Sequence, residues 1–415
     1  MANTWDFETR SIHSGFDQDK GTGATALPIY ESAAFAYDSA EDLEAAFQGR
    51  KFGHIYSRIA NPTVTAFENR VNALENGLGA IATASGMAAI ATAVYTLAQA
   101  GDEIVSGKSL FGGTFQLFNE IFGNSGIKVV YVESTATEAY RRAISPRTKL
   151  VFLETIGNPK LDIPDIGAIA AVAREQGVPL VVDSTLSTPY LFAAKRFGVD
   201  LVIHSTSKYI SGSGNTIGGI LVDLGNFDWR HCRTGAVAAL TKQAGEYAFL
   251  ARARRQVLQN TGSCLSPFNA YLQNLGLETL ALRMSKHCTN AVGLVEYFQA
   301  QPQVVSVNYP GLPGHPDHAV AAAQFHGGYG GLITLRLGTR ERCFRMINRL
   351  KMVKCLANVG DAKTLIIHPA STIYHNCSAA EQEAAGVYPD LVRISVGIES
   401  LRDIINDFDQ ALAKE

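Results

Sequence analysis

The chain has 415 residues, of which 47% are hydrophobic and 18% charged, and its formal net charge is -2 at pH 7. This length predicts two or three domains with enough apolar material for sizeable cores. The balanced charge gives no electrostatic reason to expect a nucleic acid or an anionic membrane as partner. The six cysteines form no CxxC pair, which favours reduced thiols in a cytoplasmic protein.

The first sixty-odd residues carry many turn formers and little hydrophobic periodicity, so we expect residues 1–62 to form an extended arm. A helix is predicted to begin at Asn61-Pro62-Thr63 because Phe67, Val71 and Leu74 recur on one face. It should end near Asn76-Gly77. The apolar stretch 80–101 that follows is interrupted by polar residues, which favours a buried helix over a membrane span.

Short β-rich runs then alternate with helical patterns over residues 63–262. The expected strands are 80–84, 103–106, 128–132, 150–154, 180–183, 201–204 and 219–222. The expected helices are 87–100, 114–122, 166–176 and 190–197. This alternation predicts an α/β domain with a mostly parallel seven-stranded sheet covered by helices on both faces.

After about residue 260 the pattern changes. A long helical stretch, 267–299, leads into strands expected at 304–309, 331–337, 364–367 and 391–396, and the chain ends on a polar helix. These features predict a smaller α+β C-terminal domain over residues 263–415.

Three strand ends carry polar residues, at the edge where parallel sheets bind ligands. Ser85-Gly86-Met87 opens a helix, so it is either a phosphate-binding turn or a tight turn that needs glycine. Asp183 ends an apolar run, where a carboxylate needs a partner; it could cap a helix, form a salt bridge or face a cationic ligand nitrogen. The next strand leads into Ser205, Ser207 and Lys208, which could surround the same ligand as Asp183.

Two familiar phosphate motifs do not account for Lys208. The glycines of HSTSKYISGSGN follow the lysine, whereas a P-loop places them before it, and Gly212-Ser213-Gly214 lacks the spacing of a dinucleotide fingerprint. Pyridoxal 5'-phosphate (PLP) fits better, since it needs a lysine, a carboxylate at its ring nitrogen and a dianion cradle. Phe111 could stack on its ring, although a core phenylalanine is the alternative. Tyr56 and Arg58 could contact the phosphate, although they could also be an ordinary surface pair.

The chain resembles the Cys/Met-metabolism family of fold-type I PLP-dependent enzymes from about residue 8 to its C-terminus. The motifs that carry the resemblance are YSR at 56–58, NPT at 61–63, ASGMAA at 84–89, GGT at 112–114, Glu154 with NP at 158–159, VDST at 182–185, HSTSKY at 204–209, GDAKTL at 360–365, HPAS at 368–371 and VRISVGIE at 392–399.

The resemblance implies a role for each matching residue. Lys208 would bond covalently to the cofactor, Asp183 would pair with its ring nitrogen, and Phe111 would stack on the ring. The phosphate would be held by Ser85, Gly86, Met87, Ser205 and Ser207, and by Tyr56 and Arg58 of a neighbouring subunit. Thr185 and Asn158 would also contact the cofactor, and Arg393, Asn158, Thr364 and Tyr56 the substrate. A dimer at least would then be required, and family members are commonly tetramers.

Within the family, the segments 266–272, 276–284, 360–372 and 384–399 resemble the O-acetylhomoserine sulfhydrylase branch. The resemblance therefore implies γ-replacement: sulfide or a small thiol displaces acetate from O-acetyl-L-homoserine, giving homocysteine or methionine. A γ-elimination or replacement of the methionine γ-lyase or cystathionine synthase and lyase type is the alternative. Most relatives carry tyrosine where this chain has Phe111, so a hydroxyl for proton transfer would have to come from elsewhere, with Tyr56 the nearest candidate.

The segment His315-Pro316-Asp317-His318 has a spacing seen in metal sites, but it lies in a Gly/Pro-rich stretch with no cysteine nearby. We interpret it as a loop and expect no metal site in this chain.

Overall fold

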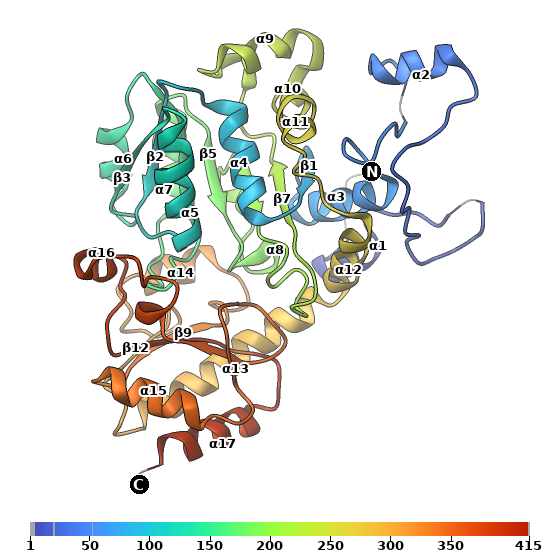
Figure 1. The fold of residues 1–415 in the computed structure, drawn as a ribbon. Helices are drawn as coiled ribbons and strands as arrows, with labels where there is room; N and C mark the ends of the chain where they lie inside the picture. The colour runs from blue at the N-terminus through green and yellow to red at the C-terminus, as the bar shows by residue number, and fades with distance from the viewer. Residues whose placement is uncertain (1–4, 20, 52, 414–415) are drawn as a thin grey trace.

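The computed structural model describes residues 5–19, 21–51 and 53–413. Two β-sheets organise the chain (Figure 1). The larger contains β1 (Gly79–Thr83), β2 (Glu103–Gly107), β3 (Lys128–Val132), β4 (Thr148–Glu154), β5 (Leu180–Asp183), β6 (Leu201–His204) and β7 (Gly219–Asp223). The smaller contains β8 (Ser306–Asn308), β9 (Leu332–Arg336), β10 (Lys354–Cys355), β11 (Leu365–Ile367) and β12 (Leu391–Ser395).

The seven-stranded sheet has the order β1-β7-β6-β5-β4-β2-β3. Strand β7 runs antiparallel to both of its neighbours, and every other pair is parallel. The predicted mostly parallel seven-stranded sheet is confirmed. Because β4, β5 and β6 are adjacent and parallel, their carboxyl ends meet at one edge of the sheet.

The helices connect and cover these strands. The α-helices are α1 (Phe7–His13), α2 (Ala40–Phe47), α3 (Pro62–Glu75), α4 (Gly86–Leu97), α5 (Gly112–Gln116), α6 (Thr137–Ala143), α7 (Ile166–Glu175), α8 (Thr188–Leu191), α9 (Gly235–Ala244), α10 (Ala248–Arg252), α11 (Gln259–Thr261), α12 (Pro267–Glu278), α13 (Leu280–Gln299), α14 (His318–Gln324), α15 (Arg340–Arg349), α16 (Ala379–Ala384) and α17 (Leu401–Leu412). The π-helices are η1 (Leu117–Phe122) and η5 (Ala253–Leu258); the 3-10 helices are η2 (Ala194–Phe197), η3 (Trp229–His231), η4 (Gly245–Tyr247) and η6 (Pro369–Ser371).

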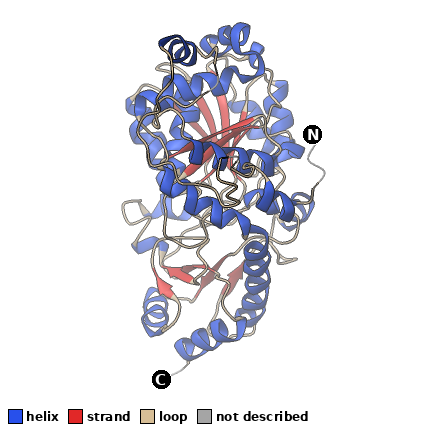
Figure 2. Cartoon of the chain, turned by 90° about the vertical axis from the view of Figure 1, so that its right-hand side faces the viewer, coloured by secondary structure: helices blue, strands red, loops and turns tan. Residues whose placement is uncertain are grey.

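Alternate residues of each central strand point to opposite faces of the larger sheet, and both faces are apolar. On β5, Leu180 and Val182 join the core cluster that includes residues of α3 and α7, while Val181 joins the one that includes residues of α4 and α10. Helices therefore cover both faces, as the near-continuous apolar strands predict. Figure 2 shows the strands of this sheet inside a shell of helices.

The smaller sheet packs one face against helices. Ile333 of β9 and Ile394 of β12 share a buried cluster with residues of α13, α15 and α17, among them Phe298 and Phe408. Helix α13 runs along this second body, as Figure 1 shows. The predicted α+β character of this region is confirmed.

Several element boundaries differ from the expectations. The helix expected over 190–197 is divided into α8 and η2, because Phe192 is extended. The stretch 267–299 is divided into α12 and α13 at Thr279. The expected arm contains two helices, α1 and α2, and its part around α2 projects away from the main body (Figure 1). The division into residues 1–62, 63–262 and 263–415 stays a prediction.

No helix among residues 5–19, 21–51 and 53–413 is long and apolar enough to cross a membrane. All six cysteines carry free thiols.

Candidate active site

A cavity of about 500 Å³ lies at the carboxyl ends of β4, β5 and β6, where segments of the smaller body also reach it. The residues predicted from the sequence that line it are Ser85, Gly86, Met87, Phe111, Asn158, Asp183, Thr185, Ser205, Ser207, Lys208 and Arg393. Segments almost 310 positions apart in the chain therefore converge on one space.

Lys208 lies in the turn that follows β6, and its Nζ donates a hydrogen bond of 2.6 Å to Oδ1 of Asn358. Burial, with a smaller contribution from the positive charge of Arg393, lowers the pKa of Lys208 to about 8. At pH 7 roughly a tenth of such an amine is neutral, about three hundred times more than for an ordinary lysine. This amine is therefore partly available as a nucleophile and base.

Asp183 ends β5 and faces the cavity. Its Oδ1 accepts the backbone N–H of Thr185 at 2.9 Å. Burial raises the pKa of Asp183, and the hydrogen bonds from Thr185 oppose that shift. A cationic ligand nitrogen would stabilise the ionised form of this carboxylate.

The N-terminus of α4 forms one wall of the cavity. Ser85 is its N-cap, and its side chain accepts the N–H of Ala88 at 3.1 Å. A Cβ on Gly86 would lie 2.6 Å from Cβ of Ser205, and one on Gly219 would lie 2.2 Å from the carbonyl oxygen of Ser85. Only glycines allow this helix end to approach the turn after β6 so closely, which brings free N–H groups and serine hydroxyls together as an anion site.

Arg393 lies on β12 and is only 3% exposed. Its Nη1 donates to Oδ1 of Asn158 at 2.9 Å, and its Nη2 donates to the carbonyl of Asn358 at 3.3 Å. Its Nε has no hydrogen-bond partner among the residues that the structure describes. A buried guanidinium with an unpaired N–H in a cavity is suited to an anionic ligand group such as a carboxylate.

Glu154 also lines the cavity, although no role was expected for it. It pairs with Asp183 in the β4–β5 register, and its Oε1 accepts the backbone N–H of Phe111 at 2.7 Å. Burial, followed by the negative charge of Asp183, raises the pKa of Glu154 well above its usual range. Glu154 therefore holds the backbone of Phe111 in a setting that favours the protonated acid.

We expect Glu154→Gln to retain the activity within about threefold, because the amide keeps the acceptor for Phe111 and, like the protonated acid that burial favours, carries no charge. Glu154→Leu should lose roughly tenfold, because the N–H of Phe111 is then left without its partner. Steady-state rates of both variants between pH 6 and 8 check this. A Gln variant as impaired as the Leu variant would mean that the charge of Glu154 is required.

Three expected residues lie outside this cavity. Tyr56 is 42% exposed and lies under the guanidinium of Arg58, whose carbon is 5.5 Å from the ring centroid. Arg58 also donates to the backbone carbonyl of Gln259. Thr364 is fully buried; its hydroxyl donates to Oε2 of Glu399 at 2.8 Å and accepts the N–H of Gly397 at 2.9 Å. The structure thus does not bring these residues into the cavity of their own chain.

Sequence reasoning missed Asn358, the hydrogen-bond partner of Lys208. It stands two positions before the motif GDAKTL at 360–365, and this proximity was the only signal that could have indicated it. Among the described residues, no group of three or more His, Cys, Asp or Glu side chains is arranged to hold a metal ion.

The cavity fits PLP in three respects. Asp183 is a buried carboxylate at the end of its strand, Lys208 is a buried amine, and the α4 N-terminus lies against Ser205. These are the carboxylate, lysine and phosphate cradle that the cofactor needs. Phe111, at the cavity wall, is 40% exposed and so presents an uncovered ring.

A family profile and individual proteins are similar to this chain. The profile of the Cys/Met metabolism PLP-dependent enzymes matches residues 8–413. O-acetyl-L-homoserine sulfhydrylase 1 of Thermus thermophilus is 43% identical, over 98% of this chain and 100% of that protein.

Two solved structures share the fold. A Campylobacter jejuni structure named as an O-acetylhomoserine (thiol)-lyase, which contains N'-pyridoxyl-lysine-5'-monophosphate, has a TM-score of 0.94 at 31% identity, covering 98% of this chain and 100% of the other. Cystathionine gamma-lyase of Lactobacillus plantarum has a TM-score of 0.86 at 32% identity, covering 98% of each chain. The chain therefore belongs to the Cys/Met-metabolism family of PLP-dependent enzymes.

Proposed function

We propose that this enzyme catalyses γ-replacement on O-acetyl-L-homoserine, in which sulfide or a small thiol takes the place of acetate. The observation that carries the proposal is the shared cavity of Lys208, Asp183 and Arg393, which offers a base, a carboxylate and a carboxylate receptor to one amino-acid substrate. The sulfhydrylase name of a relative that is 43% identical over 98% of the chain supports this choice among the family's reactions.

The cofactor supplies an electron sink for the negative charge that develops on the substrate Cα. In our proposal, the α4 N-terminus with Ser85, Gly86 and Met87, together with Ser205 and Ser207, binds its phosphate. Asp183 provides the fixed negative charge at its ring nitrogen, with Thr185 orienting that carboxylate. Phe111 covers one face of the ring.

We propose that Arg393 binds the substrate carboxylate, with Asn158 fixing the guanidinium from the opposite body. Lys208 then removes protons from the substrate Cα and Cβ and returns them after the exchange at Cγ. Its long flexible side chain reaches both carbons, and its lowered pKa of about 8 keeps part of the amine neutral. Acetate leaves Cγ with the bonding pair, and the incoming sulfur supplies the pair for the new bond.

Tyr56 and Arg58 are proposed to complete the site of a second copy of the chain. Their surface position in the arm and their absence from the cavity of their own chain support this assignment. The enzyme would then be at least a dimer, with a dimer of dimers as the larger assembly. Thr364 is proposed to act indirectly, by holding Glu399. The six free thiols support a cytoplasmic location.

The second candidate is a γ-elimination, as in a methionine or cystathionine γ-lyase. The structural likeness to cystathionine gamma-lyase, at a TM-score of 0.86, favours it. The two reactions need the same base, carboxylate and carboxylate receptor, and they differ in whether a sulfur nucleophile replaces the leaving group.

A substrate-pair assay distinguishes these reactions. The purified holoenzyme is given acetyl-, succinyl- and phospho-homoserine, each with sulfide, methanethiol or cysteine, and methionine alone as the elimination control. We expect O-acetyl-L-homoserine with sulfide to give homocysteine and acetate in equal amounts. Release of 2-oxobutanoate and ammonia instead, with no sulfur incorporated, would contradict the replacement and support the elimination.

A further inference from the structure

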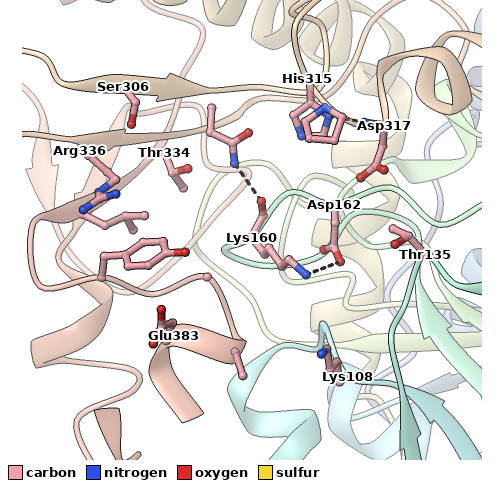
Figure 3. A pocket seen from close by; sticks show the side chains of 16 residues that line it. Lys108, Thr135, Lys160, Asp162, Ser306, His315, Asp317, Thr334, Arg336 and Glu383 are labelled. Atoms are coloured by element: carbon pink, nitrogen blue, oxygen red, sulfur yellow. Dashed lines mark hydrogen bonds and ion pairs between the residues drawn. The ribbon is translucent and has the colours of Figure 1, made fainter. Parts of the chain in front are cut away.

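A second cavity, of about 590 Å³, lies between the two bodies, and none of the described residues lines both cavities. Lys108, Thr135, Lys160 and Asp162 line it from the larger body, and Ser306, Thr334 and Arg336 from the smaller. Figure 3 shows Arg336 on one side of this space and Asp317 with Asp162 on the other. Nothing in the proposed reaction uses these residues.

Arg336 is held as a receptor for a carboxylate. Its Nε donates to Oδ1 and Oδ2 of Asp390 at 3.0 and 3.1 Å, and its guanidinium carbon is 4.6 Å from the centroid of the Tyr388 ring. Its two terminal nitrogens have no hydrogen-bond partner among the described residues. The side chain is 44% exposed, so a ligand can reach these nitrogens. A guanidinium fixed on one edge and one face, with its other edge free, can bind a carboxylate through two parallel hydrogen bonds.

The opposite side of the cavity offers carboxylate oxygens. Oδ2 of Asp317 accepts the backbone N–H of Ile163 at 3.0 Å, while its Oδ1 has no partner among the described residues. Asp162 is 7% exposed at its side chain and pairs with Lys160 at 3.5 Å. A third carboxylate, that of Glu383, lies below Arg336 on the same side of the space in Figure 3 and forms no side-chain hydrogen bond with a described residue.

Anionic side chains outnumber cationic side chains around this cavity. The cationic side chains are Lys108, Lys160 and Arg336, and the anionic ones are Glu133, Asp162, Asp317, Glu383 and Asp390. His315 adds no charge near pH 7, because burial lowers its pKa. Asp317 and Glu383 therefore lack a cationic partner among the described residues, and the two ammonium groups of one occupant would supply it. With a carboxylate that binds Arg336, such an occupant has a net charge of +1 and lowers the excess negative charge of the site from two to one.

We propose that this cavity is an accessory binding site for a basic α-amino acid. The carboxylate of the ligand binds the free edge of Arg336, its α-ammonium group binds Glu383 on the same side of the cavity, and the ammonium group of its side chain reaches across to Asp317. Thr135, Ser306 and Thr334 supply polar walls.

Two segments connect this site to Arg393, the proposed receptor for the substrate carboxylate. Thr334 pairs with Arg393 across the β9–β12 ladder, two residues from Arg336 on the same strand. Lys160 stands two residues after Asn158, which accepts the hydrogen bond of Arg393. The accessory site and the first cavity thus share a strand pair and a loop.

Calorimetric titration of the holoenzyme with L-lysine tests the proposal, with the visible absorbance of the cofactor recorded in parallel. We expect one binding event per chain that leaves this absorbance unchanged, which separates it from binding at the first cavity. Pentane-1,5-diamine lacks the carboxylate, 6-aminohexanoate lacks the α-ammonium group and L-norleucine lacks the ammonium group of the side chain. Each should bind roughly tenfold more weakly or worse.

Substitutions in the cavity test whether L-lysine binds there. Arg336→Gln and Asp317→Asn should each weaken L-lysine binding roughly tenfold or more, and Asp317→Asn keeps the acceptor for Ile163 and so preserves the fold. Arg345→Gln, on the exposed face of α15, should bind as the wild type does. Absence of a spectrally silent event, equal binding of the diamine, or silent binding that survives Asp317→Asn would each overturn the proposal, and all three tests are independent of the reaction catalysed in the first cavity.

Discussion

Lys208→Ala is expected to abolish turnover, with a loss of at least about a thousandfold, and to remove the visible absorbance of the holoenzyme at roughly 420 nm. We propose this amine as both the covalent attachment point and the base, and its only hydrogen-bond partner among the described side chains is Asn358. No other lysine of the described ranges lines the cavity. Rates of the purified variant with O-acetyl-L-homoserine and sulfide, together with an absorbance spectrum, measure both losses.

Lys363→Ala is the matched control for this experiment. Lys363 is 53% exposed at its side chain and pairs with Asp361 at 2.7 Å, so its loss removes a lysine from the same part of the fold without touching the cavity. Its activity and spectrum should match the wild type. A Lys208→Ala enzyme that kept both its activity and its yellow colour would show that another residue binds the cofactor.

Asp183→Asn is expected to lower kcat by about a hundredfold or more, because the amide offers no negative charge where we place the ring nitrogen. The amide still accepts the N–H of Thr185, so the local fold should persist. The rate constant at saturating substrate measures the loss, and thermal unfolding of the same sample checks that the variant is folded.

Asp200→Asn separates this charge effect from the loss of any buried carboxylate. Asp200 accepts the backbone N–H of Leu180 at 2.8 Å, at the start of the strand that Asp183 ends. Burial raises the pKa of Asp200 to about 7, as it raises that of Asp183. The Asp200 variant should remain active. If both variants lost activity equally, general destabilisation would account for the effect of Asp183→Asn.

The strands that sequence reasoning located best are those with apolar runs bounded by turn residues. The bounds of β3, β5 and β6 agree with the predicted ones at both ends. The antiparallel direction of β7 was not predicted, because an apolar run looks the same in either direction. Strand β10 was missed, since two exposed residues leave no hydrophobic pattern.

Sequence reasoning predicted the site residues that lie at strand ends or in matching motifs. Asp183 and Lys208 follow neighbouring strands, so a local rule brought them together. Asn358 comes from a loop 150 positions beyond Lys208, and its contact depends on how the two bodies pack. Thr364 belongs to a matching motif, yet its hydroxyl is used inside the smaller body. A motif therefore indicates that a residue matters to a site without showing whether it touches the ligand.

The arm that carries Tyr56 and Arg58 outside their own cavity has a genetic consequence. If each copy supplies these residues to its neighbour, a dimer of one Lys208→Ala chain and one Arg58→Ala chain contains one site with both defects and one site with neither. Two alleles that are each inactive alone would then complement each other when expressed together. The unit on which selection acts in this enzyme would be the pair of chains.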